Sequence, residues 1–273
     1  MKSLTLNNGV KIPILGFGTY EILPVETKKA VLAAFKDGYR LIDTAQYYNN
    51  EREVGDAIRE SDLKREDVFI TTKTMTDGYY ETKAGLDESL AKSGLEYFDL
   101  VLIHWPMGHD RDTWCALEEA YKAGKTRAIG ISNFNSRQTM DLIKHSSVKP
   151  MVDQIETHLF LQQWKMHEFL EKAGIVHESY SPLGNGQQAL INNPVLRAIG
   201  EKYGKRPIQV VLRFLVQNDI VTIPRSTNPT HIKANIDIFD FNLDKDDLEK
   251  LRSLDKRQPI DGWPAEMRED EDY

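Results

Sequence analysis

The chain has 273 residues, a single cysteine at Cys115, and a net charge of −7 from 42 acidic and 35 basic residues. One cysteine cannot form an internal disulfide, which is typical of a reducing compartment, and the negative charge argues against a nucleic-acid partner, which selects for a basic surface. We see no secretory signal and no apolar run of the roughly 20 residues needed to cross a membrane, so we expect a cytoplasmic protein without a membrane partner.

The sequence opens on a predicted β-hairpin, because the alternating residues of LTLNNGVKIP flank an Asn-Gly turn. Short apolar runs then alternate with longer amphipathic stretches. Runs typical of buried strands occupy 14–18, 40–43, 68–73, 100–105, 127–132, 151–156, 175–181 and 220–224. Helix-like stretches occupy 26–37, 51–60, 81–92, 112–123, 136–144, 164–173, 207–217 and 229–236.

Eight strands that alternate with helices indicate an α/β protein with a parallel sheet buried on both faces. We predict a closed (β/α)8 TIM barrel with an N-terminal β-hairpin, and an open doubly wound sheet is the alternative. Because such a barrel needs about 250 residues, 1–273 is predicted to be one domain. Pro207 is expected in the first turn of its helix, and Gly94 and Gly174 at the ends of theirs. The longest irregular segment, 181–193, has a length that is usually functional in a compact domain.

Polar residues stand where most of the predicted strands end. Asp43 ends the second strand, Lys73 the third and His104 the fourth, and each interval matches the length of one strand–helix unit. In a barrel these side chains converge on the carboxyl-terminal rim, where the active sites of such barrels lie. Polar or aromatic residues also end the later strands, at Ser132, Asn133, Gln154, Glu156, Tyr180 and Arg225.

Taken singly, these residues have simpler explanations. A lone lysine at a strand end is usually a solvated charge, and a lone aspartate there is usually a turn residue or a helix cap. Lys73 and Asp43, however, both emerge from apolar strands onto a half-buried rim. An unpaired buried charge costs on the order of several kcal/mol, so we expect the two to pair. A lysine–aspartate pair on a concave face can tune the pKa of a neighbouring acid.

Tyr48, in the loop after the second strand, is the candidate acid. A free tyrosine has a pKa of about 10, which is too high for an efficient proton donor at neutral pH. We expect the Lys73 cation to lower the pKa of Tyr48, while Asp43 holds Lys73 in place and His104 donates a hydrogen bond to a substrate oxygen. Such a site can protonate a carbonyl oxygen. A reduction would also need a nicotinamide cofactor, because no side chain delivers a hydride.

Other chemistries lack their sequence signatures. His104, Asp43 and Glu156 are possible metal ligands, but no HExxH or paired Cys/His spacing occurs, so no metal is expected. There is no GxSxG elbow, although a barrel hydrolase or lyase that uses His104 and the carboxylates stays open as an alternative. Gly16 and Gly18 lack the third glycine of the Rossmann fingerprint, so a dinucleotide would have to bind at the barrel rim.

Seven motifs follow one another from the hairpin to about residue 255: LIDTAQYYNNEREVG, DVFITTK, DLVLIHWP, GISNF, DQIE, SYSPLG and IPRSTNPTHIKAN. In this order they resemble the aldo-keto reductases, in particular the bacterial branch that contains 2,5-diketo-gluconate reductases and prostaglandin F synthase-like enzymes. The resemblance implies an NADPH-dependent reductase of small-molecule aldehydes, ketones or dicarbonyls. Hydride would pass from the reduced nicotinamide to the carbonyl carbon, Tyr48 would protonate the oxygen with help from Lys73 and Asp43, and His104 would orient the carbonyl. The resemblance also implies a monomer.

The resemblance further implies where ligands bind. The substrate would contact Tyr20, Tyr47, His104 and Trp105, with Trp263 from the tail. Within the cofactor set, Ser132, Asn133 and Gln154 would hold the carboxamide, Tyr180 would stack on the nicotinamide, and residues 181–184 would line the pyrophosphate. The cofactor contacts implied are Thr19, Tyr20, Asp43, Ser132, Asn133, Gln154, Tyr180, Ser181, Leu183, Gly184, Arg225, Ser226, Thr227, His231 and Asn235.

The last motif departs from the family pattern. The family often has arginine where this chain has His231 and glutamate where it has Ala234, whereas Asn235 matches and Arg225 replaces a lysine. Histidine is mostly neutral at pH 7, so NADPH preference is expected to rest on Arg225, with weaker discrimination against NADH than in relatives with both charges. Some family members keep the barrel and the cofactor without catalysis, which is a further alternative. The presence of all four catalytic residues favours an enzyme.

Overall fold

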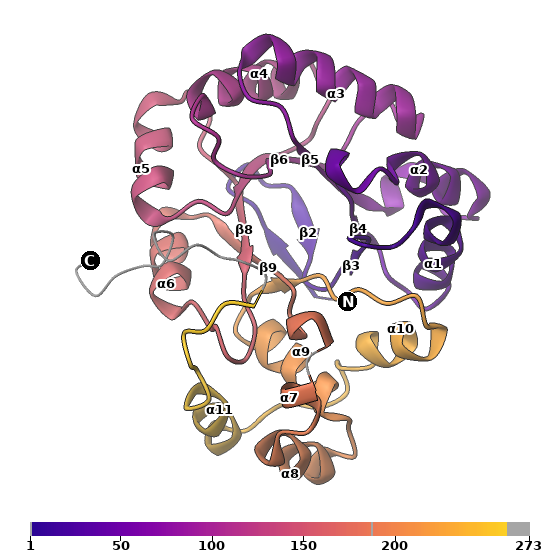
Figure 1. Ribbon diagram of the computed structural model, residues 1–273, viewed down its shortest axis with the longest axis vertical. Coiled ribbons are helices and arrows are strands. Elements are labelled where there is room, and N and C mark those ends of the chain that lie inside the picture. The colour runs from indigo at the N-terminus through magenta and orange to yellow at the C-terminus, as the bar shows by residue number, and fades with distance from the viewer. Residues whose placement is uncertain (1, 187, 261–273) are drawn as a thin grey trace.

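Eight parallel strands curl into a barrel in the computed structural model of the chain, which describes residues 2–186 and 188–260 (Figure 1). Each strand pairs with its neighbours in sequence order. The strands are β3 (Phe17–Gly18), β4 (Leu41–Asp43), β5 (Phe69–Thr74), β6 (Leu100–Ile103), β7 (Ile129–Ser132), β8 (Val152–Glu156), β9 (Val176–Tyr180) and β10 (Val221–Thr222). They occupy the predicted runs because helices cover their outer face and packed side chains fill the interior, which favours continuous apolar sequence.

The ring closes where the first strand meets the last. An isolated parallel bridge joins Leu15 to Thr222, and the Gly16 amide donates to the Thr222 carbonyl at 2.9 Å. A Cβ at Gly16 would lie 2.5 Å from Leu41 Cγ and 2.9 Å from Ile223 Cγ2, so only glycine fits this close approach. The predicted (β/α)8 barrel is therefore confirmed, and the open doubly wound alternative is wrong.

Helices surround the sheet, and those predicted from the sequence are present (Figure 1). Pro207 stands in the first turn of its helix, and Gly94 and Gly174 end theirs in the left-handed conformation, as expected. These helices are α1 (Pro24–Lys36), α2 (Glu51–Glu60), α3 (Tyr79–Ser93), α4 (Asp110–Lys122), α5 (Ser136–His145), α6 (Trp164–Ala173), α9 (Pro207–Gln217) and α10 (Pro229–Ile236).

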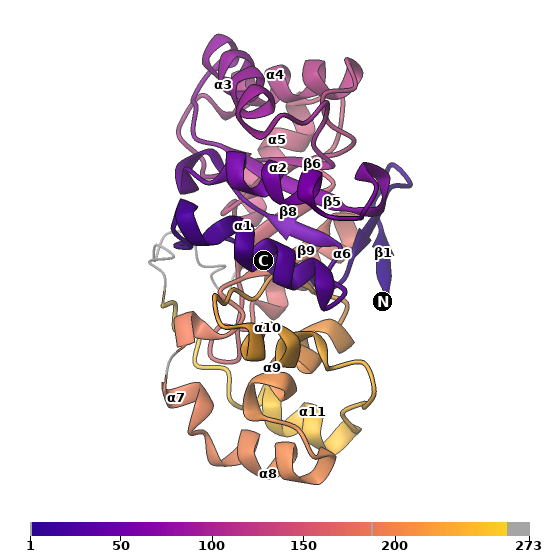
Figure 2. The same ribbon diagram turned by 90° about the vertical axis from the view of Figure 1, so that its right-hand side faces the viewer.

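Further helical segments were not predicted. The segment 181–193 contains the 3-10 turn η3 (Gly184–Gly186) and α7 (Gln188–Ile191) rather than an irregular loop. Beyond it lie α8 (Pro194–Tyr203) and, near the end of the described chain, α11 (Lys245–Arg252). Both views place α8 and α11 together on the side of the barrel opposite α3 and α4 (Figures 1 and 2). Two more 3-10 turns, η1 (Gln46–Tyr48) and η2 (Arg65–Asp67), precede α2 and β5.

The predicted hairpin is confirmed, and it lies at the amino-terminal end of the barrel. Its strands, β1 (Ser3–Thr5) and β2 (Lys11–Pro13), pair antiparallel. Side chains of its turn reach residues that precede the barrel strands: Asn7 Nδ2 donates to the Pro150 carbonyl and Asn8 Nδ2 to the Arg127 carbonyl, both at 2.9 Å. The hairpin therefore leaves the carboxyl-terminal rim, where Asp43, Lys73 and His104 lie at or just after the ends of β4, β5 and β6, open for a ligand.

Candidate active site

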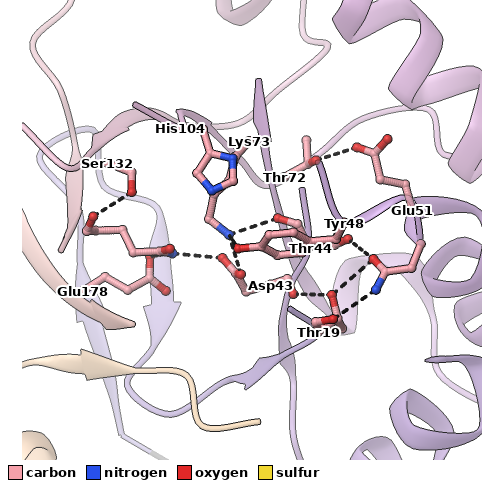
Figure 3. A network of polar contacts seen from close by, with 12 residues as sticks. Thr19, Asp43, Thr44, Tyr48, Glu51, Thr72, Lys73, His104, Ser132 and Glu178 are labelled. Atoms are coloured by element: carbon pink, nitrogen blue, oxygen red, sulfur yellow. Dashed lines mark hydrogen bonds and ion pairs between the residues drawn. The ribbon is translucent and has the colours of Figure 1, made fainter. Parts of the chain in front are cut away.

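The four residues predicted to carry the chemistry lie together at the carboxyl-terminal rim (Figure 3). Asp43 is the last residue of β4, Lys73 lies near the end of β5, His104 follows β6, and Tyr48 ends the turn η1. The Lys73 ammonium lies 2.5 Å from Asp43 Oδ1 and 3.1 Å from the Tyr48 hydroxyl. The Tyr48 and His104 rings meet edge to face, with centroids 5.7 Å apart. The parallel register of successive strands thus brings together a phenol, a lysine–aspartate ion pair and an imidazole.

Lys73 and Asp43 form the expected ion pair, and both side chains are buried, at 1% and 2% exposed. The Lys73 ammonium also donates to the Thr44 carbonyl at 3.1 Å, so its three protons have three acceptors. Burial acts to lower the pKa of Lys73, whereas the charges of Asp43 and Tyr48 act to raise it, and the net result is a raised pKa. The amine therefore stays charged beside Tyr48.

Tyr48 differs from the expectation. Burial of its hydroxyl raises the pKa of Tyr48 to about 12, and the Lys73 charge lowers this pKa without offsetting the burial. The prediction that the pKa of Tyr48 is lowered is therefore wrong for the protein without ligands. Lys73 does lower this pKa, but burial of the hydroxyl raises it by more. A phenol with this pKa is fully protonated at neutral pH, so the proton that a reduction requires is present at the site.

His104 is neutral at physiological pH. Burial, and next the positive charge of Lys73, lower the pKa of His104 to about 3. The ring is 9% exposed, and its Nδ1 atom is buried without a hydrogen-bond partner in the described structure. A neutral imidazole carries one N–H and can donate a hydrogen bond to a ligand oxygen without adding a charge.

Glu178 is a buried carboxyl behind the ion pair that the sequence interpretation missed. Gln154 Nε2 donates to Asp43 Oδ2 at 2.9 Å and to Glu178 Oε2 at 3.1 Å (Figure 3). The other oxygen, Oε1, is buried without a hydrogen-bond partner among the described residues. Burial, then the negative charge of Asp43, raise the pKa of Glu178 to about 8. The sequence did contain a signal for this residue, because Glu178 is an acid within the otherwise mostly uncharged strand 175–181.

Asn50 is a second residue with an unrecognised role, although it lies within a motif used above. Its Nδ2 donates to the carbonyls of Thr19 at 3.0 Å and Ile22 at 3.2 Å, and its Oδ1 accepts from Thr44 Oγ1 at 2.7 Å. The side chain is fully buried. Asn50 therefore fixes the loop between β3 and α1, which carries Tyr20, against the end of β4.

A cavity of about 1080 Å³ opens at this rim, which is as large as the biggest ordinary small-molecule pockets. Lys73 lies behind its wall. Among the expected cofactor contacts, Thr19 and Gly184 are not part of the lining, and the Thr19 hydroxyl instead donates to the Asp43 carbonyl at 2.9 Å. The expected residues that do line the cavity are Tyr20, Asp43, Tyr47, Tyr48, His104, Trp105, Ser132, Asn133, Gln154, Tyr180, Ser181, Leu183, Arg225, Ser226, Thr227, His231 and Asn235.

The side chains expected at the nicotinamide end of the cofactor are already hydrogen-bonded to neighbouring residues. The Tyr180 hydroxyl donates to Asn133 Oδ1 at 2.9 Å, and Asn133 Nδ2 donates to the His104 carbonyl at 2.9 Å. Ser132 Oγ donates to the Gln154 carbonyl at 2.7 Å. Asn133 and Ser181 have positive φ values of 64° and 48°, a conformation that is costly for residues other than glycine and that concentrates at functional sites. This wall is thus held in place before a ligand binds.

A buried acceptor lies among the residues that were expected to contact the adenosine part of a dinucleotide. Asn235 is 3% exposed and lines the cavity, and its Oδ1 is buried without a hydrogen-bond partner in the described part of the chain. An adenine amino group is a donor of the kind such an oxygen accepts. Arg225, Thr227 and His231 are exposed nearby in sequence, and Arg225 pairs with Glu21 at 2.8 Å.

Several lining residues were not predicted, among them Glu21, Met75, Leu196, Arg206 and Val211. The apolar members of this group come from helices or follow a strand, and their sequence pattern is the same as that of core residues, so no signal separated them. Trp263, expected near the substrate, lies outside the described residues. Within residues 2–186 and 188–260, no three His, Cys, Asp or Glu side chains are grouped to hold a metal ion. Nor does that part contain a helix long and apolar enough to cross a membrane.

The barrel and its rim define a class of protein in which a buried lysine–aspartate pair supports a tyrosine and a neutral histidine beside a long cavity. The sequence model of the Aldo/keto reductase family matches residues 14–256, and the chain belongs to this family. It is therefore an NAD(P)H-dependent oxidoreductase that reduces carbonyl compounds, and the hydrolase or lyase alternative is set aside.

Individual relatives agree in sequence and in structure. The glyoxal reductase of Bacillus subtilis (strain 168) is 44% identical over 270 residues, which cover 97% of each chain. The crystal structure of an aldo-keto reductase from a Medee basin deep-sea metagenome library has a TM-score of 0.93 at 41% identity, over 94% of this chain and 97% of that one. That of a Bombyx mori aldo-keto reductase in complex with NADP has a TM-score of 0.89 at 34% identity, over 95% and 94% of the two chains.

Proposed function

We propose that the protein is an NADPH-dependent reductase of small aldehydes, ketones and dicarbonyls in which Tyr48 donates the proton. One observation carries the proposal. The Tyr48 hydroxyl accepts a hydrogen bond from a buried, charged Lys73 at 3.1 Å, and it stands on the wall of the cavity next to the neutral ring of His104. A protonated phenol, a cation behind it and a neutral hydrogen-bond donor beside it suit a carbonyl oxygen that gains negative charge.

The side chains divide the work on the carbonyl. A bound reduced nicotinamide supplies a hydride to the carbonyl carbon. His104 donates a hydrogen bond to the carbonyl oxygen and orients it. Tyr48 keeps its proton until that oxygen becomes more basic than the phenolate, which the pKa of about 12 permits, and then transfers it. Lys73 stabilises the phenolate that remains, while Asp43 keeps Lys73 charged and in place.

NADPH is proposed as the cofactor, with NADH also accepted. The complex of the Bombyx mori relative with NADP supports NADPH. The buried Asn235 Oδ1, which has no hydrogen-bond partner among the described residues, supports a nucleotide of either kind at this end of the cavity. Ser132, Asn133, Gln154 and Tyr180 would hold the nicotinamide end. The pyrophosphate would lie along Ser181, Leu183 and Gly184, with Thr19 and Tyr20 near it, and the 2′-phosphate would meet Arg225, Ser226, Thr227 and His231.

The substrate is proposed to be a small uncharged carbonyl compound. The rim beside His104 carries Tyr20 and Tyr47, which are 40% and 59% exposed, together with Trp105 and Met75. Such a wall offers apolar area and hydroxyl donors rather than fixed charge, which suits short aldehydes and dicarbonyls. The 44% identity to a glyoxal reductase favours dicarbonyls within this class.

The test is to follow oxidation of NADPH, and separately of NADH, by absorbance with glyoxal, methylglyoxal and a panel of aldehydes. Tyr48→Phe is the paired variant because it removes the acidic proton and keeps the ring. Turnover by the parent and loss of about 10²–10⁴-fold in kcat by the variant, with cofactor affinity unchanged, is the expected result. Cofactor binding without turnover of any carbonyl compound would instead support a non-catalytic binding protein.

We also propose a single domain over residues 1–273, a monomeric state and a cytoplasmic location. The support is the one continuous barrel and the single free cysteine, Cys115, which is exposed. Size-exclusion chromatography with light scattering measures the molar mass in solution and so tests the monomeric state.

A further inference from the structure

Glu21 and Arg225 form an ion pair across the rim of the cavity. Glu21 lies in the loop after β3, and Arg225 follows β10, so they stand on the two sides of the barrel closure. Arg225 Nη2 lies 2.8 Å from Glu21 Oε2, and both residues line the cavity. The Arg225 side chain is 34% exposed and the Glu21 side chain 52% exposed, so a ligand can reach both.

The backbone holds Glu21 at this place. Glu21 has a φ of 56°, a left-handed conformation that a side-chain-bearing residue adopts at a cost. The residues around it are anchored, because Asn50 donates to the carbonyls of Thr19 and Ile22, and the Ile22 amide donates to the Thr19 carbonyl at 3.1 Å. The carboxylate is therefore carried on a fixed loop rather than on a free surface chain.

The charge balance of this end of the cavity depends on Glu21. Within residues 225–235, Arg225 is the one lysine or arginine that lines the cavity, because Lys233 is not part of the lining. The Glu21 carboxylate offsets the Arg225 charge. A 2′-phosphate that entered here would meet an arginine whose donors already face a carboxylate, and that carboxylate would also repel the phosphate. A ribose 2′-hydroxyl would meet no such penalty, since a carboxylate accepts its hydrogen bond.

We propose that Glu21 is a cofactor-specificity residue, whose carboxylate competes with the adenosine 2′-phosphate for Arg225 and so reduces the preference for NADPH over NADH. The inference rests on the cofactor site proposed above. The expectation from the sequence was that Arg225 alone sets the preference for NADPH. In this proposal Glu21, which pairs with Arg225, also affects which cofactor binds more tightly.

The experiment measures the Kd values of NADPH and NADH for the full chain and for Glu21→Gln, which keeps the size of the side chain and removes its charge. We expect the ratio Kd(NADH)/Kd(NADPH) to rise about two- to fivefold in the variant, the range of a partly exposed ion pair. The rise should shrink as salt increases. Glu26→Gln, an exposed acid in the first turn of α1 outside the cavity lining, is the matched control and should leave the ratio unchanged.

Fragments and a double mutant localise the effect. Glu21→Gln should tighten 2′,5′-ADP, which carries the 2′-phosphate, and should leave 5′-AMP unchanged or weaker. In an Arg225→Gln background the same substitution should have a smaller effect on the ratio, because the competition needs the arginine. An unchanged or lower ratio Kd(NADH)/Kd(NADPH) in Glu21→Gln would overturn the inference about Glu21. NADPH-dependent turnover by the parent would still uphold the proposed function in that case. Failure of the parent to bind either nucleotide would reject both.

Discussion

Asp43 and Glu178 share a single donor, because one side-chain nitrogen of Gln154 donates to a carboxyl oxygen of each, at 2.9 Å and 3.1 Å (Figure 3). Two carboxyl groups this close in a buried space do not both ionise readily. Asp43 has Lys73 as a partner, and Glu178 does not, so the proton resides on Glu178, whose pKa is raised to about 8. The barrel interior thus contains a carboxyl group that is neutral at physiological pH.

Glu178 should make the protein less stable as pH rises. Its pKa is about 8 in the folded protein and near 4.5 when unfolded, so between these values the folded state binds more protons. Stability contributed by this proton is complete below pH 4.5 and is lost as pH rises through 8. Glu178→Gln removes this dependence while keeping an acceptor for Gln154. We expect its free energy of unfolding to fall less than that of the parent between pH 6 and 9, as measured by urea denaturation. Parallel pH curves for the two proteins would contradict the assignment.

His104 should have the opposite dependence, because its pKa is lowered to about 3. Between about pH 6.5 and 3 the imidazole of His104 is protonated in the unfolded state and neutral in the folded state. The contribution of neutral His104 to stability is therefore present above pH 6.5 and is lost towards pH 3. We expect His104→Gln to lose less stability than the parent between pH 7 and 4. A surface comparison is His109→Gln: contact with Asp77 raises the pKa of His109, so its removal should not reduce the acid sensitivity.

The neutral state of His104 also bears on catalysis. Because its pKa lies near 3, the ring does not change charge between pH 5 and 8 in the ligand-free protein. The dependence of kcat/KM on pH should therefore show no step near 6.5, the ordinary value for histidine. A step at that pH that disappears in His104→Gln would show that the imidazole titrates during the reaction.

Removing one member of the buried ion pair should cost more than removing both. Lys73→Met leaves Asp43 charged and without its cation, which destabilises by about 3–5 kcal/mol. In Asp43→Asn/Lys73→Met no charge is left unpaired, so we expect a loss well below the sum of the two single losses. Denaturation of Lys73→Met, of Asp43→Asn and of the double variant gives the coupling energy. Additive losses would mean that the two side chains contribute independently. All three variants should be inactive as reductases.

Asn50→Ala tests the anchor of the loop that carries Tyr20 and Glu21. The substitution leaves the buried carbonyls of Thr19 and Ile22 without a donor, which costs about 1–3 kcal/mol. We expect a lower melting temperature and a raised Kd for the cofactor, since the loop loses its fixed position. Asn242→Ala, at an exposed asparagine outside the cavity lining, should leave the Kd for the cofactor unchanged. A normal cofactor Kd in Asn50→Ala would show that the loop holds its place without this side chain.

The architecture was predictable because its signal is local and repeated. Each strand is an apolar run, most of the runs end in a polar residue, and the parallel connection then dictates that Asp43, Lys73 and His104 share one rim. The helices α8 and α11 were missed even though Asn193 and Asp244 cap them and Pro194 begins α8. The α8 residues followed a segment read as irregular, and α11 is short and strongly polar, so its periodicity was weak.

The electrostatics of the site were less predictable. Sequence shows that Lys73 and Tyr48 lie at neighbouring strand ends, and so gives the sign of their interaction. It does not show how deeply the hydroxyl is buried, and that burial has the larger effect on the pKa of Tyr48. The pairing of Glu21 with Arg225 joins positions 204 residues apart, which no pattern in a single chain reports.

The closure of the barrel has a consequence for how the protein opens. Every other pair of neighbouring strands is also adjacent along the chain, whereas Leu15 and Thr222 come from its two ends and meet through short strands. We expect such a long-range contact to form late in folding, because closing the long intervening loop costs entropy. A ligand that touches both sides of this junction adds its binding free energy to the junction, by an amount that grows with ligand concentration. Hydrogen exchange at the amides of Gly16 and Thr222 would then slow on saturation more than exchange in β6 and β7, where the ring is continuous.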